Sequence, residues 1–346
     1  MKHDGRGRGR RAKALSALIG MALLAAACQA VPNDYSGDRK ADLVWFAQPD
    51  HTWHEAGAAD PIFTGQAGDL PVAGDYDGNG RWEPAVLRGR TWISATAGSI
   101  VYDPAGMPAG PAAQPWYPMG GPTLVPVPAD YDGDGKTDPA YYDLVDGTWW
   151  IMGQPSPVAF GNPPTSGGSM GYDVPVPADY NGDGKADIAI YRPSDSTFHI
   201  LSTGQVIAVG QPGDLPVPAA YNGGSRAEAA TYRQDTNQWF IDGQNVPVTV
   251  PGTIQFDGTN HFQDPAPADY DGDGRVDPAQ VDETTGAWVV QGQGTVTTIG
   301  APNPPVWDTT LAPNIVMNLV RIYFIDVCLH NPGMALSYPA HCPANP

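Results

Sequence analysis

The sequence predicts an all-β protein in which six similar units follow one another along the chain. First, a nine-residue phrase of the type DYDGDGKTD occurs six times, beginning at residues 34, 75, 130, 179, 220 and 269. Second, successive copies are 41, 55, 49, 41 and 49 residues apart, which is the length of one four-stranded blade of a β-propeller. Third, no helical periodicity is present between residues 30 and 310. We therefore predict a β-propeller of six four-stranded blades, or of seven if the C-terminal segment adds one.

Each unit reads as four short strands separated by turn residues. In the unit that begins at residue 179, DIAIYRPS follows the repeated phrase, and TFHILST and QVIAVG come next. A fourth segment, LPVPAAY, leads into the following copy. An aromatic residue stands nineteen residues after the opening position, or seventeen in the second unit, and we expect it to be buried where neighbouring blades pack. These aromatic residues are Trp53, Trp92, Trp149, Phe198, Trp239 and Trp288.

Residues 1–27 have the features of a signal peptide. The basic stretch RGRGRRAK precedes the apolar run ALSALIGMALLAAA, which is about as long as a signal-peptide core. Cys28 follows directly and resembles the acylated cysteine of a bacterial lipoprotein. Ordinary cleavage nearby, for example after Ala30, is the alternative. We predict an extracellular or cell-surface protein that meets the membrane only through a lipid anchor on Cys28.

Residues 309–346 break the repeat and form a C-terminal appendage to a propeller that spans residues 28–308. Polar residues in PNIVMNLVRIYFIDVCLH are spaced as on one face of a helix, although the β-branched content favours a strand. We expect a helix packed against the propeller, and a degenerate seventh blade is the alternative. An oxidising compartment would favour a disulfide between Cys328 and Cys342.

The charge balance of the chain limits the classes of partner. The chain has 37 Asp and Glu against 18 Lys and Arg, which gives a formal net charge of −19. Nucleic acids and anionic membranes carry the same sign of charge and would be repelled. Divalent cations suit the excess of aspartate better.

The repeated phrase has the pattern of a calcium-binding loop. Ca²⁺ takes about six to eight oxygen ligands. Side chains at loop positions 1, 3 and 5 alternate around a tight coil and can converge on one point. Glycine at positions 4 and 6 permits the left-handed backbone angles that such a coil needs. The carbonyl of position 7 and the carboxylate of position 9 would complete the shell, with the basic side chain of position 7 facing water. The alternative is an Asx-rich turn without a metal.

Three loops carry the full pattern. Loops 130–138 and 269–277 have four aspartates each, and loop 179–187 has three together with Asn181. An EF-hand would need Glu at position 12 followed by a helix, and these loops have neither. The expected ligands, with Lys and Arg acting through backbone carbonyls, are Asp130, Asp132, Asp134, Lys136, Asp138, Asp179, Asn181, Asp183, Lys185, Asp187, Asp269, Asp271, Asp273, Arg275 and Asp277.

The other three loops depart from the pattern to different degrees. Loop 75–83 closes with a longer glutamate, and its expected ligands are Asp75, Asp77, Asn79, Arg81 and Glu83. Loop 34–42 has Ser36 at position 3 and Arg39 in place of glycine, so that Asp34, Asp38 and Asp42 are weaker candidates. Loop 220–228 has Ala220, Asn222 and Gly224 at positions 1, 3 and 5, and we expect it to be empty.

On these residues the chain resembles the FG-GAP (VCBS-type) repeat family, which includes the propeller of integrin α-subunits and many bacterial surface proteins. The resemblance covers roughly residues 29–308. It rests on the nine-residue loops, on the PVP or PAP that precedes them, and on stretches such as VAFG at 158–161. It implies a propeller whose loops bind Ca²⁺ on one rim.

The sequence has no recognisable catalytic constellation. No G-x-S-x-G nucleophile elbow occurs, and His51-x-x-His54 has no partner carboxylate motif. We therefore expect an exported, calcium-stabilised and monomeric propeller that acts as a non-catalytic binding or adhesion module for a protein or glycan. The alternatives are a carbohydrate-binding lectin-like propeller, with sugar pockets between blades, and a lyase or hydrolase with a site in the central channel.

Overall fold

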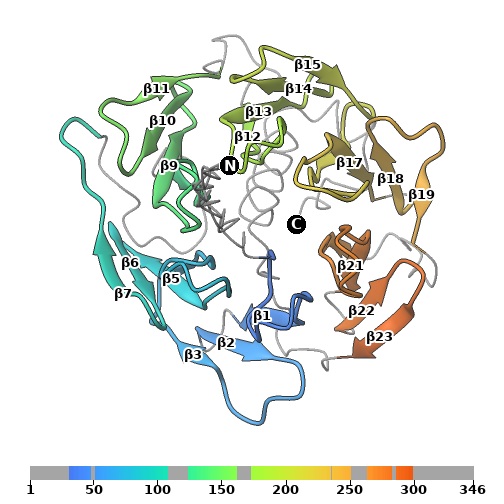
Figure 1. Cartoon of the computed structure of the whole chain (residues 1–346), viewed down its shortest axis with the longest axis horizontal. Helices are drawn as coiled ribbons and strands as arrows, with labels where there is room; N and C mark the ends of the chain where they lie inside the picture. The colour runs from blue at the N-terminus through green and yellow to red at the C-terminus, as the bar shows by residue number, and fades with distance from the viewer. Residues whose placement is uncertain are drawn as a thin grey trace, which may run out of the picture.

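The protein is a six-bladed β-propeller. A computed structural model describes residues 31–47, 51–107, 124–161, 173–234, 236–250, 263–282 and 286–298. Within these residues there are six antiparallel sheets and no helix, so none is present that could cross a membrane. The sheets stand around a common axis (Figure 1). The all-β class and the six blades are confirmed, whereas the signal peptide, Cys28, the C-terminal appendage and the 328–342 disulfide lie outside the described residues.

Each blade is formed by one continuous stretch of chain. The first three sheets contain β1 (Val44–Ala47), β2 (Thr52–Glu55) and β3 (Phe63–Thr64); β4 (Leu70–Pro71), β5 (Ala85–Arg88), β6 (Thr91–Ser94) and β7 (Gly98–Val101); and β8 (Leu124–Pro126), β9 (Ala140–Asp143), β10 (Thr148–Ile151) and β11 (Val158–Ala159). The last three contain β12 (Val174–Pro175), β13 (Ala189–Arg192), β14 (Thr197–Ile200) and β15 (Val206–Ala208); β16 (Leu215–Pro216), β17 (Ala230–Arg233), β18 (Gln238–Ile241) and β19 (Val248–Thr249); and β20 (Gln263–Pro265), β21 (Ala279–Asp282), β22 (Ala287–Val290) and β23 (Gly294–Thr298).

In five of the six blades, the strand that precedes the loop pairs with the strand that follows it. In the fourth blade β12 pairs with β13, and the isolated bridge between Ala178 and Asp187 carries this ladder up to the ends of the loop. The segment expected as the fourth strand of one unit is therefore the innermost strand of the next blade (Figure 1). The loop decides this pairing because its two ends are held side by side.

The repeated aromatic residues form the core between and within blades, as predicted. All six are 0–1% exposed. Trp92 of the second blade meets Tyr141 of the third edge-on, with ring centroids 5.7 Å apart. Within the third blade Trp149 packs against Tyr142 at 5.0 Å. A buried indole contributes a large apolar area, so these contacts hold neighbouring sheets together.

Tryptophans outside the repeated position are less buried. Trp45 is half-buried and stacks on His54, with ring centroids 5.4 Å apart. Trp150 is also half-buried and packs against the core cluster that contains Trp92 and Tyr141 of the second and third blades. Trp116 and Trp307 lie outside the described residues. Trp82 packs against the core cluster of the first blade, so all three described tryptophans outside the repeated position take part in local packing.

Candidate metal-binding loops

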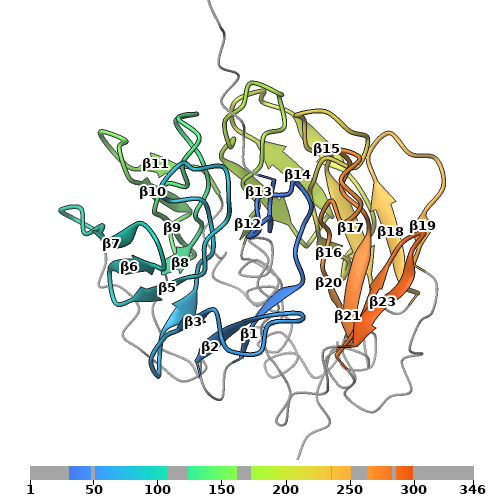
Figure 2. The same cartoon turned by 60° about the horizontal axis from the view of Figure 1, so that its bottom comes forward.

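Five of the nine-residue loops connect the innermost strand of their blade to its second strand, and loop 34–42 directly precedes β1 of the three-stranded first blade. They follow one another around the propeller axis, which Figure 2 shows obliquely. Because every loop occupies the same place in its blade, the sixfold repeat of the sequence becomes a ring of loops. Their internal geometry decides whether they can hold an ion.

The loop coil is organised by its own side chains. In loop 130–138 the carboxylate of Asp130 accepts hydrogen bonds from the N–H groups of Gly133 (2.6 Å) and Gly135 (2.9 Å). The φ angles of these glycines are +81° and +84°, in the left-handed region that glycine adopts readily. Asp132 accepts from the N–H of Asp134 at 3.0 Å. The coil is therefore preformed by successive turns of the Asx type.

The same arrangement recurs around the ring. The position 1 carboxylate accepts from the N–H of position 6 at 2.8 Å in loops 34–42, 75–83 and 179–187 and at 2.9 Å in loop 269–277. In the first loop this donor is Arg39, whose φ is +70°. A non-glycine residue thus keeps the left-handed angle at the place where the sequence departs from the pattern.

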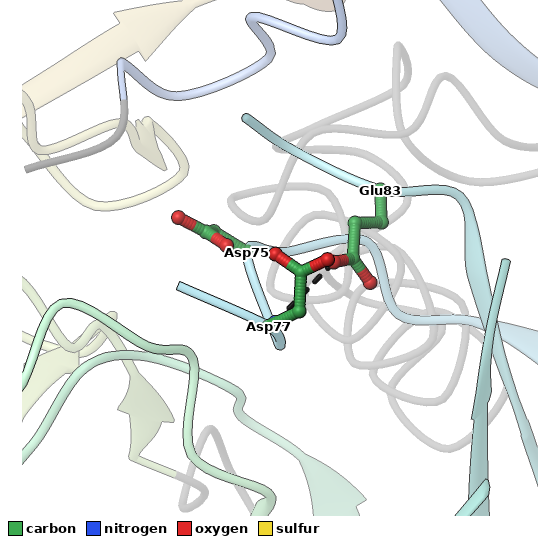
Figure 3. A group of neighbouring side chains, drawn as sticks. All are labelled: Asp75, Asp77 and Glu83. Atoms are coloured by element: carbon green, nitrogen blue, oxygen red, sulfur yellow. Dashed lines mark hydrogen bonds between the residues drawn. The ribbon is translucent and has the colours of Figure 1, made fainter. Parts of the chain in front are cut away.

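Acidic side chains converge in three of the loops. One ligand oxygen from each member of a group lies within 4.8 Å of the others, and the groups found among the described residues are Asp75, Asp77 and Glu83; Asp130, Asp132 and Asp138; and Asp269, Asp271 and Asp273. Figure 3 shows the first group, with the carboxylate of Glu83 beside that of Asp77. The longer closing glutamate of loop 75–83 therefore does not prevent convergence.

Loops 34–42 and 179–187 do not form such a group of three acids. In loop 179–187 position 3 is Asn181, whose amide nitrogen donates to Asp187 at 2.9 Å and whose amide oxygen accepts from the N–H of Asp183 at 2.8 Å. In loop 220–228 Asn222 instead accepts from the side chain of Gln244 at 3.2 Å. The side-chain oxygen at position 3 of loop 220–228 is therefore bonded to a residue outside the loop.

The converging carboxylates repel one another. Partial burial, followed by the charges of Asp132, Asp130 and Asp134, raises the pKa of Asp138 to about 6. Burial and the neighbouring aspartates likewise raise the pKa of Asp277 to about 6. A cation between these groups would offset the repulsion. The donors are hard oxygen atoms, which suit Ca²⁺ or Mg²⁺ better than a soft transition metal.

Backbone hydrogen bonds join the loops into a closed ring. The N–H of position 8 in each loop donates to the carbonyl of position 1 in the preceding loop, at 2.6–3.0 Å. The last loop meets the first in the same way, because the N–H of Ala41 donates to the carbonyl of Asp269 at 2.7 Å. The six donors are Ala41, Trp82, Thr137, Ala186, Ala227 and Val276. Each loop is therefore linked to both neighbours.

The basic side chain of position 7 lies over the preceding loop. A Cβ atom on Gly133 would be 2.9 Å from Cγ of Lys185, and one on Gly272 would be 3.1 Å from Cγ of Lys40. Both lysines are exposed, so their ammonium groups reach water as expected. The expectation was incomplete, however, because the aliphatic stems cover the glycine of the neighbouring loop. A basic residue in all six copies was the signal for this contact.

Three ion pairs between partly exposed arginines and buried aspartates, which sequence reasoning did not predict, lie at the opposite end of the inner strands. Arg88, Arg192 and Arg233 each bind the Asp that stands 19 residues earlier, through Nε and Nη2, at distances of 2.7–3.0 Å. The side chains of the three aspartates, which are Asp69, Asp173 and Asp214, are only 1–3% exposed. The sequence carried a signal for these pairs, because in three units an Asp stands 19 residues before an Arg.

The two histidines of the first blade do not join a metal group. Nε2 of His54 lies 2.6 Å from the hydroxyl of Thr52, and its ring stacks on Trp45. Among the described residues, the groups able to hold a metal contain acidic side chains only. The His51-x-x-His54 spacing therefore reflects local packing of a hairpin.

A cavity of about 390 Å³ lies between the fourth and fifth blades. Its wall includes Gln205 of the fourth blade and Arg226, Glu228 and Asp242 of the fifth. Glu228 closes loop 220–228, which has no aspartate at positions 1, 3 and 5, and accepts from the N–H of Asn222 at 3.1 Å. The cavity thus combines charged and polar groups beside the loop that is least suited to a metal.

Comparison with known proteins assigns the chain to no family. No protein-family model matches the chain, and no curated protein matches it. One solved structure that it resembles is a lectin of Agrocybe aegerita described as specific for non-reducing terminal N-acetylglucosamine. The identity is 17%, the match covers 82% of this chain and 85% of the lectin, and the TM-score is 0.44.

Proposed function

We propose that the protein is an exported β-propeller of the FG-GAP (VCBS) type, stabilised by Ca²⁺, that acts as a non-catalytic binding or adhesion module at the cell surface. The observation that carries this proposal is the convergence of acidic oxygens in loops 75–83, 130–138 and 269–277. The signal peptide and the acylated Cys28 expected from the sequence would place the propeller outside the cell. Its partner would be a protein or a glycan.

Calcium would act here as a structural clip. In each occupied loop the side chains of positions 1, 3, 5 and 9 and the carbonyl of position 7 would hold the ion. This would tie the innermost strand to the second strand. Through the hydrogen bond from position 8 to the preceding loop, the ion would also support the neighbouring blade. Sites of this kind in extracellular proteins have dissociation constants of about 10⁻⁴–10⁻³ M.

Calcium counting tests this proposal. Equilibrium dialysis with radioactive Ca²⁺ should show that Asp132→Ala binds one ion fewer than the unaltered protein, since Asp132 belongs to one converging group. Asp60→Ala is the matched control, because Asp60 is exposed and lies outside the loops. Addition of EDTA should lower the melting temperature of the unaltered protein. Equal melting with and without EDTA, or equal ion counts for both variants, would contradict the proposal.

A glycan is the second candidate partner, and the cavity between the fourth and fifth blades favours it. Its carboxylates and amide could accept and donate hydrogen bonds to hydroxyl groups. A glycan array probed in the presence of Ca²⁺ would test this directly. Binding that is lost in Glu228→Gln but kept in Asp60→Ala would support the candidate. If no glycan on the array bound, protein ligands would remain the proposed class.

A further inference from the structure

One junction of the loop ring carries a side-chain contact in addition to the backbone bond. The N–H of Thr137, at position 8 of loop 130–138, donates to the carbonyl of Asp75 at 2.6 Å. In return, the N–H of Asp75 donates to Oγ1 of Thr137 at 2.9 Å. The residues at position 8 of the other loops are Ala41, Trp82, Ala186, Ala227 and Val276, and none of these has a hydroxyl group. Loops 75–83 and 130–138 are therefore joined by a reciprocal pair of hydrogen bonds.

Gly74 leaves the space that Thr137 occupies. A Cβ atom on Gly74 would lie 2.6 Å from Oγ1 of Thr137 and 2.8 Å from its Cγ2, so no larger residue fits there without a shift. The corresponding residue in the other blades is Asn33, Ala129, Ala178, Ala219 or Ala268. The glycine and the threonine therefore depart from the repeat together, on the two sides of one junction.

The two loops joined in this way both have converging acidic groups. Among the described residues three loops have such a group, and of these only 75–83 and 130–138 follow one another in the ring. The third, loop 269–277, is separated from them by loop 34–42 on one side and by loops 179–187 and 220–228 on the other. The reciprocal contact thus lies between the one neighbouring pair of converging acidic groups that the described chain contains.

Thr137 is connected through its backbone to an expected ligand in each loop. Its N–H shares a peptide group with the carbonyl of Lys136, the position 7 ligand expected in loop 130–138. A cation held by this carbonyl would polarise the peptide group and strengthen the bond that its N–H donates. The acceptor of that bond is Asp75, the position 1 ligand expected in loop 75–83. The side chain of Lys136 also covers the earlier loop, since a Cβ atom on Gly78 would be 2.9 Å from its Cε.

We propose that loops 75–83 and 130–138 bind Ca²⁺ cooperatively and that Thr137 couples the two sites. The inference rests on the calcium sites of the proposed function. The first ion would fix Asp75 and Lys136 relative to each other, so the second would meet an ordered loop and lose less conformational entropy. We expect a coupling of about fivefold, at the low end of the usual range, because both hydrogen bonds join neutral groups. Thermodynamic linkage makes the coupling equal in both directions.

A purely structural brace between the second and third blades is the alternative role for Thr137. Such a brace would raise the melting temperature by the same amount with and without Ca²⁺, and it would not change how the ions bind. Repulsion between two bound ions would act against cooperativity, so binding is measured in KCl of about 0.15 M, where charges are screened over about 8 Å. Binding isotherms therefore distinguish coupling from bracing.

Two full-length variants with two converging loops each provide the comparison. Both carry Asp183→Ala, which removes the site expected in the fourth blade. Asp183→Ala/Asp271→Ala keeps the neighbouring pair of loops, whereas Asp183→Ala/Asp132→Ala keeps loop 75–83 and the separated loop 269–277. Both variants lose the same charge, and the substituted aspartates are exposed. Equilibrium dialysis with radioactive Ca²⁺ should count two ions in each. The Hill coefficient should be about 1.4 for the neighbouring pair, as a fivefold coupling requires, and at or below about 1 for the separated pair, because unequal independent sites can only lower it.

Thr137→Val, added to the variant with the neighbouring pair, tests the coupling residue. Valine keeps the shape of threonine and leaves every expected ligand in place, so two ions should still bind while the Hill coefficient falls to about 1. Thr64→Val, at an exposed position of the outer strand β3, is the control and should keep a Hill coefficient of about 1.4. A coefficient of about 1 or less for the neighbouring pair, or no change with Thr137→Val, would overturn the inference and leave the calcium proposal standing. Absence of bound Ca²⁺ in both variants would overturn the calcium proposal and this inference with it.

Discussion

The ion pair between Arg233 and Asp214 should make a large contribution to the stability of the propeller. Asp214 is 2% exposed at its side chain and accepts two bonds of 2.8 Å from Arg233. Removal of one partner of a buried pair costs about 3–5 kcal/mol because a buried charge remains. Here the N–H of Gln211 still donates to Asp214 at 2.9 Å, and the side chain of Arg233 is 18% exposed. We therefore expect Arg233→Met to lower the free energy of unfolding by about 2–3 kcal/mol.

One additional contact raises this figure. The guanidinium carbon of Arg233 lies 4.1 Å from the ring centroid of Phe240. A partly exposed contact of this kind contributes about 0.5–1 kcal/mol. Methionine keeps most of the aliphatic stem, so lost packing adds little. The total of about 3 kcal/mol corresponds to a fall in melting temperature of about 4–5 °C, because the unfolding entropy is about 2.1 cal/mol/K per residue.

Thermal and urea unfolding, followed by circular dichroism at saturating Ca²⁺, measure the effect. The matched control is Arg90→Met, because Arg90 pairs with Asp103, whose side chain is 60% exposed. An exposed pair contributes about 0–1 kcal/mol. The double variant Arg233→Met/Asp214→Leu should recover at least half of the loss, since it also removes the buried charge. Equal losses for Arg233→Met and Arg90→Met would refute the reasoning.

Two further substitutions test the loop ring and the contact between blades. Gly133→Ala should lower the free energy of unfolding by about 1–2 kcal/mol through left-handed strain, plus the displacement of Lys185. Gly243→Ala is the control, because Gly243 also has a left-handed φ but a Cβ atom there would meet no neighbouring atom. If denaturant unfolding gave the same loss of free energy for both variants, the contact between the Lys185 side chain and Gly133 would be contradicted. Trp92→Ala should cost about 3–5 kcal/mol, because it opens a cavity beside Tyr141. A loss below about 1 kcal/mol in thermal unfolding would argue against a core role for this residue.

The sequence alone determined the blade as the repeating unit, the place of the loops and the buried aromatic positions, and it left six or seven blades open. These features depend on short-range chemistry that every copy repeats. Glycine at Gly133 and Gly135 permits the turn, acidic residues beside it accept the backbone donors, and alternation of apolar residues sets the strands. A pattern of this kind can be read within one unit and confirmed by its recurrence. The ligand chemistry proposed for the loops was accessible for the same reason.

The tertiary structure decided how the units are joined and which acidic groups meet. The pairing of the inner strand with its following strand, the bond from Ala41 to Asp269 and the stem of Lys185 over Gly133 all join residues whose distance the sequence does not encode. Loop 75–83 shows the limit well, since only its folded geometry reveals that a longer glutamate still reaches the other two carboxylates. Local patterns specify backbone conformation, whereas convergence of side chains depends on where the closed ring places each strand.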